Sequence, residues 1–201
     1  MRTYNFFATV SRMKYIHRWA LMRNSRAEDL SEHSLEVAMI VHALCTIGNV
    51  RFGRHLNSER AVLIAIYHDA SEIITGDMPT PVKYFSDEIR MAYKDVEHLA
   101  EDHLLEGLPE DMRPIYEDIL KGNDTEEDHV LHRYVKAADK LSALIKCIEE
   151  ERAGNTEFRT AAITTRDSLV EMSTEVPEIS AFLEEFLPAY GKTLDELLST
   201  R

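Results

Sequence analysis

The chain has 201 residues, of which 44% are apolar and 29% are charged, and its formal net charge at pH 7 is −13. This composition is typical of a folded, soluble protein, and we expect a single domain that spans residues 1–201. So large a negative charge argues against polymeric nucleic acid, which binds through many Lys and Arg contacts to phosphates. It does not exclude a small anionic substrate beside a cation.

The few glycines and prolines, seven and six, favour long helices with short connections. The two cysteines, Cys45 and Cys147, have no metal-like spacing, which favours a reducing compartment. The N-terminal segment lacks the apolar region and cleavage site of a signal peptide, and no apolar run approaches the ~18–20 residues that cross a bilayer. We therefore expect a cytoplasmic protein with no membrane partner.

A first helix is predicted over residues 5–16, and the stretch after it, residues 17–24, has no clear period. That stretch contains Arg18 and the only tryptophan, Trp19. The guanidinium could bind a phosphate, and the indole could offer a flat face to a base or sugar. The alternative is a tryptophan packed on the core beside a solvated arginine, because tryptophan is highly buried on average.

A second helix is predicted to begin with Ser31 as its N-cap and to end at Gly48–Asn49. His33 lies just inside this helix and begins a stripe that must face inward. The stripe continues through apolar residues: Val37, Ile40, Leu44 and Ile47.

The helix predicted from Asn57 or Ser58 has apolar residues on all sides, so we expect it to be the central, most buried helix. Its apolar run ends in the adjacent pair His68 and Asp69, and Glu72 follows one helical turn later on the same face. Burying these three groups is unfavourable unless they are satisfied, and a divalent metal ion would do so. The alternative is a histidine bonded to a core carbonyl, with Asp69 capping a neighbour.

The chain then breaks at Gly76 into a stiff polar loop, residues 75–81 with the sequence TGDMPTP. A long helix is predicted over residues 83–106, with these side chains inward: Tyr84, Phe85, Ile89, Tyr93, Val96, Leu99 and Leu104. Further helices are predicted over residues 110–121, 125–153, 156–174, 177–187 and 193–199. Asp139 interrupts the apolar stripe of the helix 125–153, which indicates a specific partner. The sequence shows no clear strand, so the predicted fold class is all-α.

His33, the His68–Asp69 pair and Asp139 project from three different helices, each at a position expected to face inward. Two imidazoles and two carboxylates suit a divalent ion such as Mn, Co, Zn or Mg. Ligands on three helices would make a rigid site, with water at the remaining coordination positions. These residues therefore predict one bound divalent metal ion.

The order H…HD…D resembles the signature of HD-domain metal-dependent phosphohydrolases, which are all-helical bundles. A more specific resemblance is to the 5′-deoxynucleotidase branch of that superfamily. It rests on these motifs, in order: RW at 18–19, SEHS at 31–34, YHDASE at 67–72, TGDMPTPVK at 75–83 and AD at 138–139. The likeness covers most of the chain and weakens after about residue 160. It agrees with a helical bundle whose central buried helix carries the His–Asp pair.

This resemblance implies that a homodimer hydrolyses deoxyribonucleoside 5′-monophosphates to deoxynucleoside and phosphate, with little regard for the base. Arg18 would bind and orient the phosphate, Trp19 would pack against the nucleotide, and Glu72 would be the catalytic carboxylate. The implied metal ligands are His33, His68, Asp69 and Asp139. The further implied substrate-binding residues are His33, Asp69, Asp77, Met78, Pro79, Thr80 and Asp139.

Three other interpretations use the same residues. Another HD-type activity, such as cleavage of a cyclic dinucleotide or a hyperphosphorylated guanosine nucleotide, would usually need a larger basic surface or further metal ligands. A nucleotide-sensing domain with a structural metal would have no use for Glu72 beside Arg18. A plain helical bundle with buried polar pairs is the third, and four ligand-type residues on three helices argue against it.

Overall fold

The computed structural model describes residues 3–83 and 85–199. Within these ranges the chain is helical, and its one extended pairing is an isolated antiparallel bridge between His17 and Asp29. The all-α prediction is therefore confirmed. The α-helices are α1 (Phe6–Val10), α2 (Leu30–Arg51), α3 (Ser58–Tyr67), α4 (Glu72–Thr75), α5 (Thr80–Lys83), α6 (Asp87–Glu106), α7 (Arg113–Lys121), α8 (Glu126–Arg152), α9 (Arg159–Met172), α10 (Glu178–Glu185) and α11 (Leu194–Leu198). The 3-10 helices are η1 (Ser11–Tyr15), η2 (Thr156–Phe158) and η3 (Leu187–Ala189).

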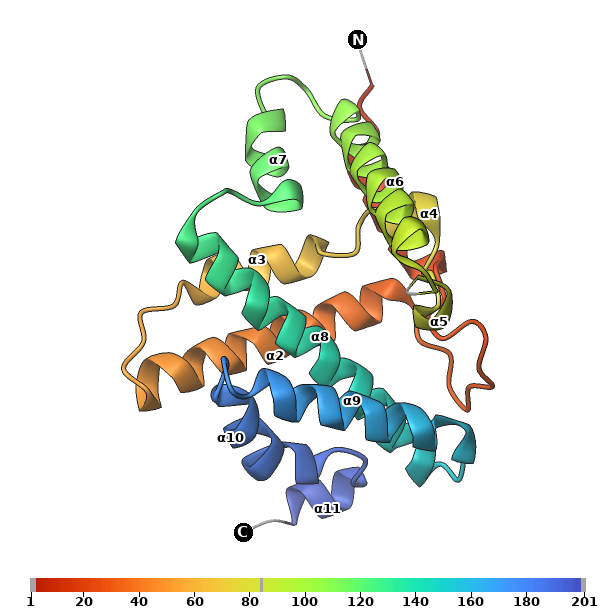
Figure 1. Ribbon diagram of the computed structural model, residues 1–201, viewed down its shortest axis with the longest axis vertical. Helices are drawn as coiled ribbons and strands as arrows, with labels where there is room; N and C mark the ends of the chain where they lie inside the picture. The colour runs from red at the N-terminus through yellow and green to blue at the C-terminus, as the bar shows by residue number, and fades with distance from the viewer. Residues whose placement is uncertain (1–2, 84, 200–201) are drawn as a thin grey trace.

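The centre of the fold is the crossing of α8 over α2 and α3, with α6 and α7 at one end of the molecule and α9 to α11 at the other (Figure 1). The main hydrophobic cluster is built from α2, α3, α8, α9 and α10. Its fully buried side chains include Leu44 of α2, Ile64 of α3 and Leu141 of α8. Removal of this apolar surface from water is the main force that holds the helices together.

Helix α2 begins with Asp29 as its N-cap. The Asp29 carboxylate accepts hydrogen bonds from the backbone N–H groups of Ser31 (2.9 Å) and Glu32 (3.0 Å). The prediction of Ser31 as the N-cap was wrong, because Asp29 already satisfies the free amides of the first turn. The helix also continues beyond Gly48 instead of ending there. Glycine is needed at this position because the Glu178 side chain packs closely against the helix, and a Cβ on residue 48 would lie 2.8 Å from Oε1 of Glu178.

The helix predicted to run through the His68–Asp69 pair is broken. Helix α3 ends just before the pair, residues 68–71 form a turn, and α4 begins at Glu72. The turn is anchored by Ala70, which is fully buried in a second hydrophobic cluster. The other buried members of that cluster are Phe6, Leu104, Leu105 and Leu108. The His–Asp pair therefore lies on a turn that joins the two clusters.

The prediction that α3 is the most buried helix was also wrong. Three of its residues are buried (Ala61, Ile64 and Ala65), whereas α2 and α8 each contribute many more. These two longer helices are the central ones because each packs against neighbours on several sides (Figure 1).

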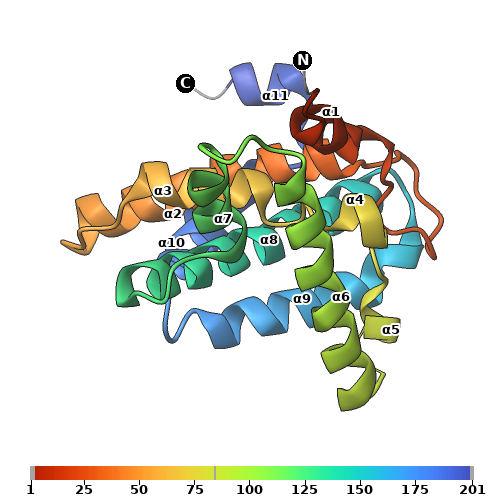
Figure 2. The same cartoon turned by 90° about the horizontal axis from the view of Figure 1, so that it is seen from above.

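Helix α6 begins later than predicted, and its inward face differs from the expected one. Tyr93 and Leu104 are buried as predicted. Other apolar side chains expected inward are exposed: Phe85 (80%), Ile89 (38%), Val96 (47%) and Leu99 (67%). Tyr84 lies outside the described residues. The difference arises because α6 and α5 extend away from the layer of α2, α3 and α8 (Figure 2), which leaves part of the apolar face of α6 without a covering helix.

Helix α2 has the length and the apolar composition of a membrane-spanning helix, contrary to the expectation that no segment approaches them. In its most apolar window, 56% of the residues are buried inside the protein. Packing against α3 and α8 accounts for this composition, because a helix covered on most sides is apolar on most sides.

Candidate metal and phosphate site

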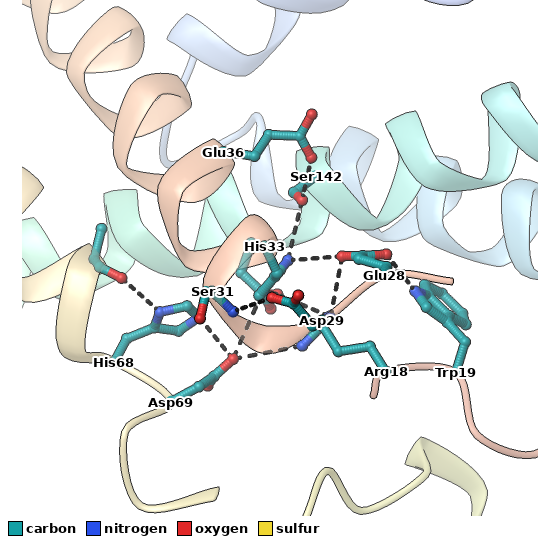
Figure 3. Close-up of polar contacts among 12 residues, drawn as sticks. Arg18, Trp19, Glu28, Asp29, Ser31, His33, Glu36, His68, Asp69 and Ser142 are labelled. Atoms are coloured by element: carbon teal, nitrogen blue, oxygen red, sulfur yellow. Dashed lines mark hydrogen bonds and ion pairs between the residues drawn. The ribbon is translucent and has the colours of Figure 1, made fainter. Parts of the chain in front are cut away.

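Three helix-borne segments bring the predicted ligands together. Donor atoms of His33 (α2), His68 (the turn after α3) and Asp139 (α8) all lie within 4.8 Å of one another. Nε2 of His33 is 3.2 Å from Oδ1 of Asp139 and 3.6 Å from Oδ2 of Asp69. Nε2 of His68 is 3.0 Å from the same Asp69 oxygen (Figure 3). Three of the four predicted ligands therefore face one point, and the fourth, Asp69, lies beside both imidazoles.

Both imidazoles direct Nε2 at this point because their Nδ1 atoms are engaged elsewhere. Nδ1–H of His68 donates to the Ala65 carbonyl at 2.7 Å. Nδ1–H of His33 donates to Oγ of Ser142 at 3.1 Å, since the Ser142 hydroxyl itself donates to Glu36 at 2.6 Å. These partners fix the tautomer that carries its lone pair on Nε2, the form in which histidine binds a metal.

The two Nε2 atoms are buried, and although they lie 3.0 and 3.2 Å from carboxylate oxygens of Asp69 and Asp139, neither meets hydrogen-bond geometry with a described residue. A buried polar atom without a partner is unfavourable and needs an explanation. A divalent cation held by the imidazoles of His33 and His68 and the carboxylates of Asp69 and Asp139 would satisfy these atoms, so the donor set fits such an ion. The alternative interpretation of His68, a bond to a core carbonyl, is present in the structure, but it uses Nδ1 and leaves Nε2 available.

The charges of the site favour a cation. Burial raises the pKa of Asp139, but His33, His68 and Arg18 outweigh it, and the net effect lowers that pKa. Burial lowers the pKa of His68, but Asp69 and Asp139 outweigh it and raise that pKa to about 9. A metal ion would take the place of the proton that these carboxylates hold on the imidazole.

Arg18 reaches the same centre from the loop between η1 and α2. Its Nη1 is 3.5 Å from Oδ2 of Asp69, and its Nη2 is 3.9 Å from Oδ1 of Asp139. The side chain is only 12% exposed, so the alternative of a solvated arginine is wrong. Burial opposes the charge of Arg18, but Asp139, Asp69 and Glu28 outweigh it and raise its pKa. The site therefore holds a permanent guanidinium beside the predicted metal ligands.

Trp19 packs against the core and also borders the site. Its ring centroid is 5.3 Å from that of the buried Phe158, and its Nε1–H donates to Oε2 of Glu28 at 3.1 Å. Its backbone has φ 58°, a left-handed conformation that bulky residues rarely adopt. Such strain persists only where surrounding contacts impose it, and it is frequent at functional sites.

Glu72 and Asp77 border the ligands on the side of the polar loop. Glu72 is 7% exposed, and its Oε2 is buried without a hydrogen-bond partner in the described part of the chain. Burial, Asp69 and Asp77 together raise the pKa of Glu72 to about 9. Burial also raises the pKa of Asp77, opposed by Arg18 and by a hydrogen bond from the Trp19 backbone. The loop that carries Asp77 thus contacts the loop that carries Arg18 and Trp19.

Helix α6 anchors the polar loop at both ends. The Tyr93 hydroxyl lies 3.0 Å from Oγ1 of Thr75 and 3.1 Å from the Gly76 carbonyl oxygen. At the other end, Nζ of Lys83 is 2.8 Å from Oε1 of Glu97. Between these anchors the structure places the remaining predicted substrate residues, of which Met78 and Pro79 are half-buried and Thr80 is exposed at the start of α5.

Sequence reasoning missed the residues that support the ligands: Glu28, Glu36 and Ser142. Ser142 lies three residues after Asp139 on α8, and this spacing places both on one helix face. That signal was available in the sequence. Glu28 had no such signal in the sequence, because it lies in a polar stretch without helical periodicity. It contacts the site only through the folding of the loop between η1 and α2.

Comparison with known proteins places this architecture in a family. The model of the family described as 5′-deoxynucleotidase YfbR-like matches residues 5–190. A 5′-deoxynucleotidase from Erwinia tasmaniensis is 47% identical over 193 residues, which cover 96% of each chain.

Two solved structures are similar in fold. An HD-domain phosphohydrolase from Listeria innocua has a TM-score of 0.78 and 26% identity, covering 92% of this chain and 87% of that one. The cyanophage S-2L HD phosphohydrolase DatZ, solved with dA and one catalytic Zn²⁺ ion, has a TM-score of 0.66 and 15% identity, covering 90% of this chain and 95% of that one. At that identity the likeness to DatZ shows the fold alone. The match over residues 5–190 and the 47% identity show that this chain belongs to the YfbR-like 5′-deoxynucleotidase family, whose members are hydrolases.

Proposed function

We propose that this protein hydrolyses deoxyribonucleoside 5′-monophosphates to deoxynucleoside and phosphate, with one divalent metal ion held by His33, His68, Asp69 and Asp139. The observation that carries the proposal is the pair of buried Nε2 atoms that lie against the Asp69 and Asp139 carboxylates without making a hydrogen bond, beside a buried arginine. When bound, such an ion lowers the pKa of a coordinated water and neutralises phosphate charge. Co, Mn, Zn and Mg all suit this donor set.

Arg18 binds and orients the phosphate. Its Nε is 3.3 Å from Oε1 of Glu28, which leaves Nη1 and Nη2 directed toward Asp69 and Asp139. A phosphate dianion at the metal would meet these two N–H groups, and a guanidinium fork matches its oxygens in geometry and charge. As charge spreads over the phosphoryl oxygens during transfer, the same contact becomes stronger.

Glu72 is the acid–base group of the proposed reaction. Hydrolysis takes one proton from the attacking water and gives one to the leaving 5′-oxygen. Glu72 is buried at the edge of the site, its Oε2 has no partner among the described residues, and it lies close enough to Asp69 for their charges to interact. A carboxyl group in that position is suited to move one of these protons.

The polar loop forms the nucleoside side of the site. Asp77 offers a carboxylate to a sugar hydroxyl, most simply the 3′-OH, while Met78, Pro79 and Thr80 follow it on the loop. Trp19, joined to Asp77 through its backbone, packs against the nucleotide from the opposite segment. These contacts are made to the sugar and to one face of the base, and none of them reads the edge of the base, so the enzyme accepts several bases. Met78 and Trp19 are the candidates that exclude a 2′-hydroxyl.

The proposal extends to the form of the protein. Residues 1–201 make one domain, the protein works as a homodimer, and it acts in the cytoplasm. Two buried free cysteines, Cys45 and Cys147, agree with a reducing compartment.

A panel of phosphate esters tests the function. The purified protein, depleted of metal by chelation, is assayed after addition of Mn, Co, Zn or Mg. We expect no turnover after chelation and hydrolysis of deoxynucleoside 5′-monophosphates once a metal is restored. Turnover of cyclic dinucleotides or hyperphosphorylated guanosine nucleotides in place of monophosphates would contradict the proposal.

A further inference from the structure

Glu28 joins three parts of the site through one carboxylate. Its Oε1 lies 3.3 Å from Nε of Arg18 and 3.4 Å from Nδ1 of His33, and its Oε2 accepts a hydrogen bond from Nε1 of Trp19 at 3.1 Å (Figure 3). The side chain is 13% exposed, so solvent screens these contacts weakly. The carboxylate thus contacts the proposed phosphate-binding, nucleoside-binding and metal-binding residues at the same time.

The backbone fixes Glu28 in this position. The segment between η1 and α2 folds back on itself at the bridge of His17 and Asp29, and within it the Arg18 N–H donates to the Glu28 carbonyl at 3.0 Å. Glu28 and Arg18 therefore face each other across the base of the loop through both backbone and side chain. Little freedom remains for either side chain to reach other partners.

Each of the three contacts selects an orientation that the proposed chemistry needs. The ion pair at 3.3 Å keeps Nε of Arg18 beside Glu28, without hydrogen-bond geometry, and leaves Nη1 and Nη2 for a phosphate. Holding the indole N–H fixes the plane of Trp19. The contact with Nδ1 of His33 supports the tautomer with Nε2 unprotonated, although Ser142 also accepts from that Nδ1 at 3.1 Å. His33 therefore has two supports, whereas among the described residues Glu28 alone forms an ion pair with Nε of Arg18 and a hydrogen bond with the Trp19 indole N–H.

We propose that Glu28 is a positioning residue that sets Arg18 and Trp19 relative to His33, so that the phosphate, the nucleoside and the metal ion are aligned as one unit. The proposal rests on the roles given to Arg18, Trp19 and His33 in the proposed function, and it adds Glu28 as the residue that couples them. Outer-sphere groups of this kind typically contribute about 10- to 100-fold to affinity or activity.

The first test uses Glu28→Gln, with Glu32→Gln as a matched control. Glu32 is on the same chain segment, one residue before His33, but its carboxylate pairs with the exposed Arg26. Because the chain has one tryptophan, its fluorescence reports on Trp19 alone, even in the metal-free protein. We expect Glu28→Gln to change the emission spectrum and to speed the local depolarisation of Trp19, while Glu32→Gln leaves both unchanged.

The second test is a double-mutant cycle between Glu28→Gln and Arg18→Ala, measured as kcat/KM for a deoxynucleoside 5′-monophosphate. If Glu28 acts through Arg18, its substitution should lower kcat/KM about 10- to 100-fold in the wild-type background and have much less effect in Arg18→Ala. Metal affinity should change less than kcat/KM, because Ser142 still supports His33. Additive effects would overturn the coupling, since they would mean that Glu28 does not act through Arg18.

A shorter acid keeps the test decisive if Glu28→Gln does not fold. Glu28→Asp retains the charge but is one methylene too short to reach all three partners, so we expect it to fold and to show the same loss of kcat/KM and the same faster depolarisation. The outcomes also separate the two proposals. If the wild-type protein with metal does not turn over deoxynucleoside 5′-monophosphates, the proposed function is wrong, and if Arg18→Ala has wild-type kcat/KM, the coupling through Arg18 is wrong. If Arg18→Ala is impaired but Glu28→Gln and Glu28→Asp behave like Glu32→Gln, the function stands and the positioning role is wrong.

Discussion

Nε2 of His33 lies 3.2 Å from Oδ1 of Asp139, a contact that joins the first turn of α2 to the middle of α8. Across this contact, two helices of the main core face each other with groups that bind metal ions. The rigidity of the site therefore comes from the packing of the core itself.

Asp139→Ala should remove the bound metal and lower activity by more than about 100-fold, while the protein remains helical. The proposed role of the Asp139 carboxylate is to bind the ion, so its loss need not destabilise the fold, because removal of a buried charge can favour packing. Metal content by atomic spectroscopy and helicity by circular dichroism would measure both effects. Asp95→Ala, at an exposed position on α6, is the control. Full activity of a metal-depleted Asp139→Ala sample would be incompatible with the assignment.

Glu72→Gln should separate proton transfer from binding. The amide keeps the shape of the side chain but cannot exchange a proton, so turnover should fall by about 10²-fold or more. Metal and nucleotide should bind as in the wild type, which titration calorimetry would show. If the variant lost the metal instead, Glu72 would be a ligand and the mechanism would need revision.

Arg18→Ala should lower kcat/KM for every deoxynucleotide by a similar factor, because its proposed contact is to phosphate alone. The order of preference among bases should not change. Arg26→Ala is the matched control, since Arg26 lies on the same loop but pairs with Glu32 at the surface. A change in base preference in Arg18→Ala would place the guanidinium against the base, contrary to our account.

Glu150 makes the loop that carries Arg18 and Trp19 sensitive to acid. Its carboxylate accepts hydrogen bonds from the backbone N–H groups of Ser25 (2.8 Å) and Arg26 (3.3 Å) and pairs with Lys146. Burial raises the pKa of Glu150, but hydrogen bonds from Lys146, Asn155 and Ser25 outweigh it and lower that pKa to about 2.

A carboxylate whose pKa is lowered by folding stabilises the folded protein above its ordinary pKa, and the effect is lost as pH falls through the lowered value. Glu150→Gln should therefore reduce the free energy of unfolding at pH 7 by roughly 1–3 kcal/mol, the usual contribution of hydrogen bonds to a charged group. The difference from wild type should shrink between about pH 4.5 and pH 2. Urea unfolding of the wild type and of Glu150→Gln at pH 7 and pH 3 would measure this difference in the free energy of unfolding. If the difference were the same at both pH values, the charge of Glu150 would not be what holds the loop.

The metal ligands could be predicted from the sequence because a polar residue in an apolar helical stripe is conspicuous. His33 and Asp139 both stand out in this way, and the adjacent pair of His68 and Asp69 follows a wholly apolar run. Burial of such groups requires partners, and this requirement does not depend on the details of the fold.

Other features could not be predicted because they depend on tertiary contacts. Residues 68–71 contain no glycine or proline to mark a break, and the turn forms where Ala70 packs into the second cluster. Phe85 and Leu99 fit a helical stripe, but no described helix covers them. Glu28 enters the site only because the loop between η1 and α2 closes on itself.

The central claim concerns the substrate, and it rests on the placement of Arg18 beside the predicted metal ligands and of Asp77 on the polar loop that contacts the loop of Arg18. Arg18 suits a terminal 5′-phosphate, whereas a 3′-phosphate would bring further negative charge against Asp77, an unfavourable contact in a partly desolvated site. The most direct measurement compares initial rates on 5′-deoxynucleotides, 3′-deoxynucleotides and 5′-ribonucleotides in the presence of a divalent metal. We predict hydrolysis of 5′-deoxynucleotides with several bases, slower hydrolysis of ribonucleotides and poor hydrolysis of 3′-monophosphates. Equal rates on the 3′- and 5′-deoxynucleotides would contradict this placement.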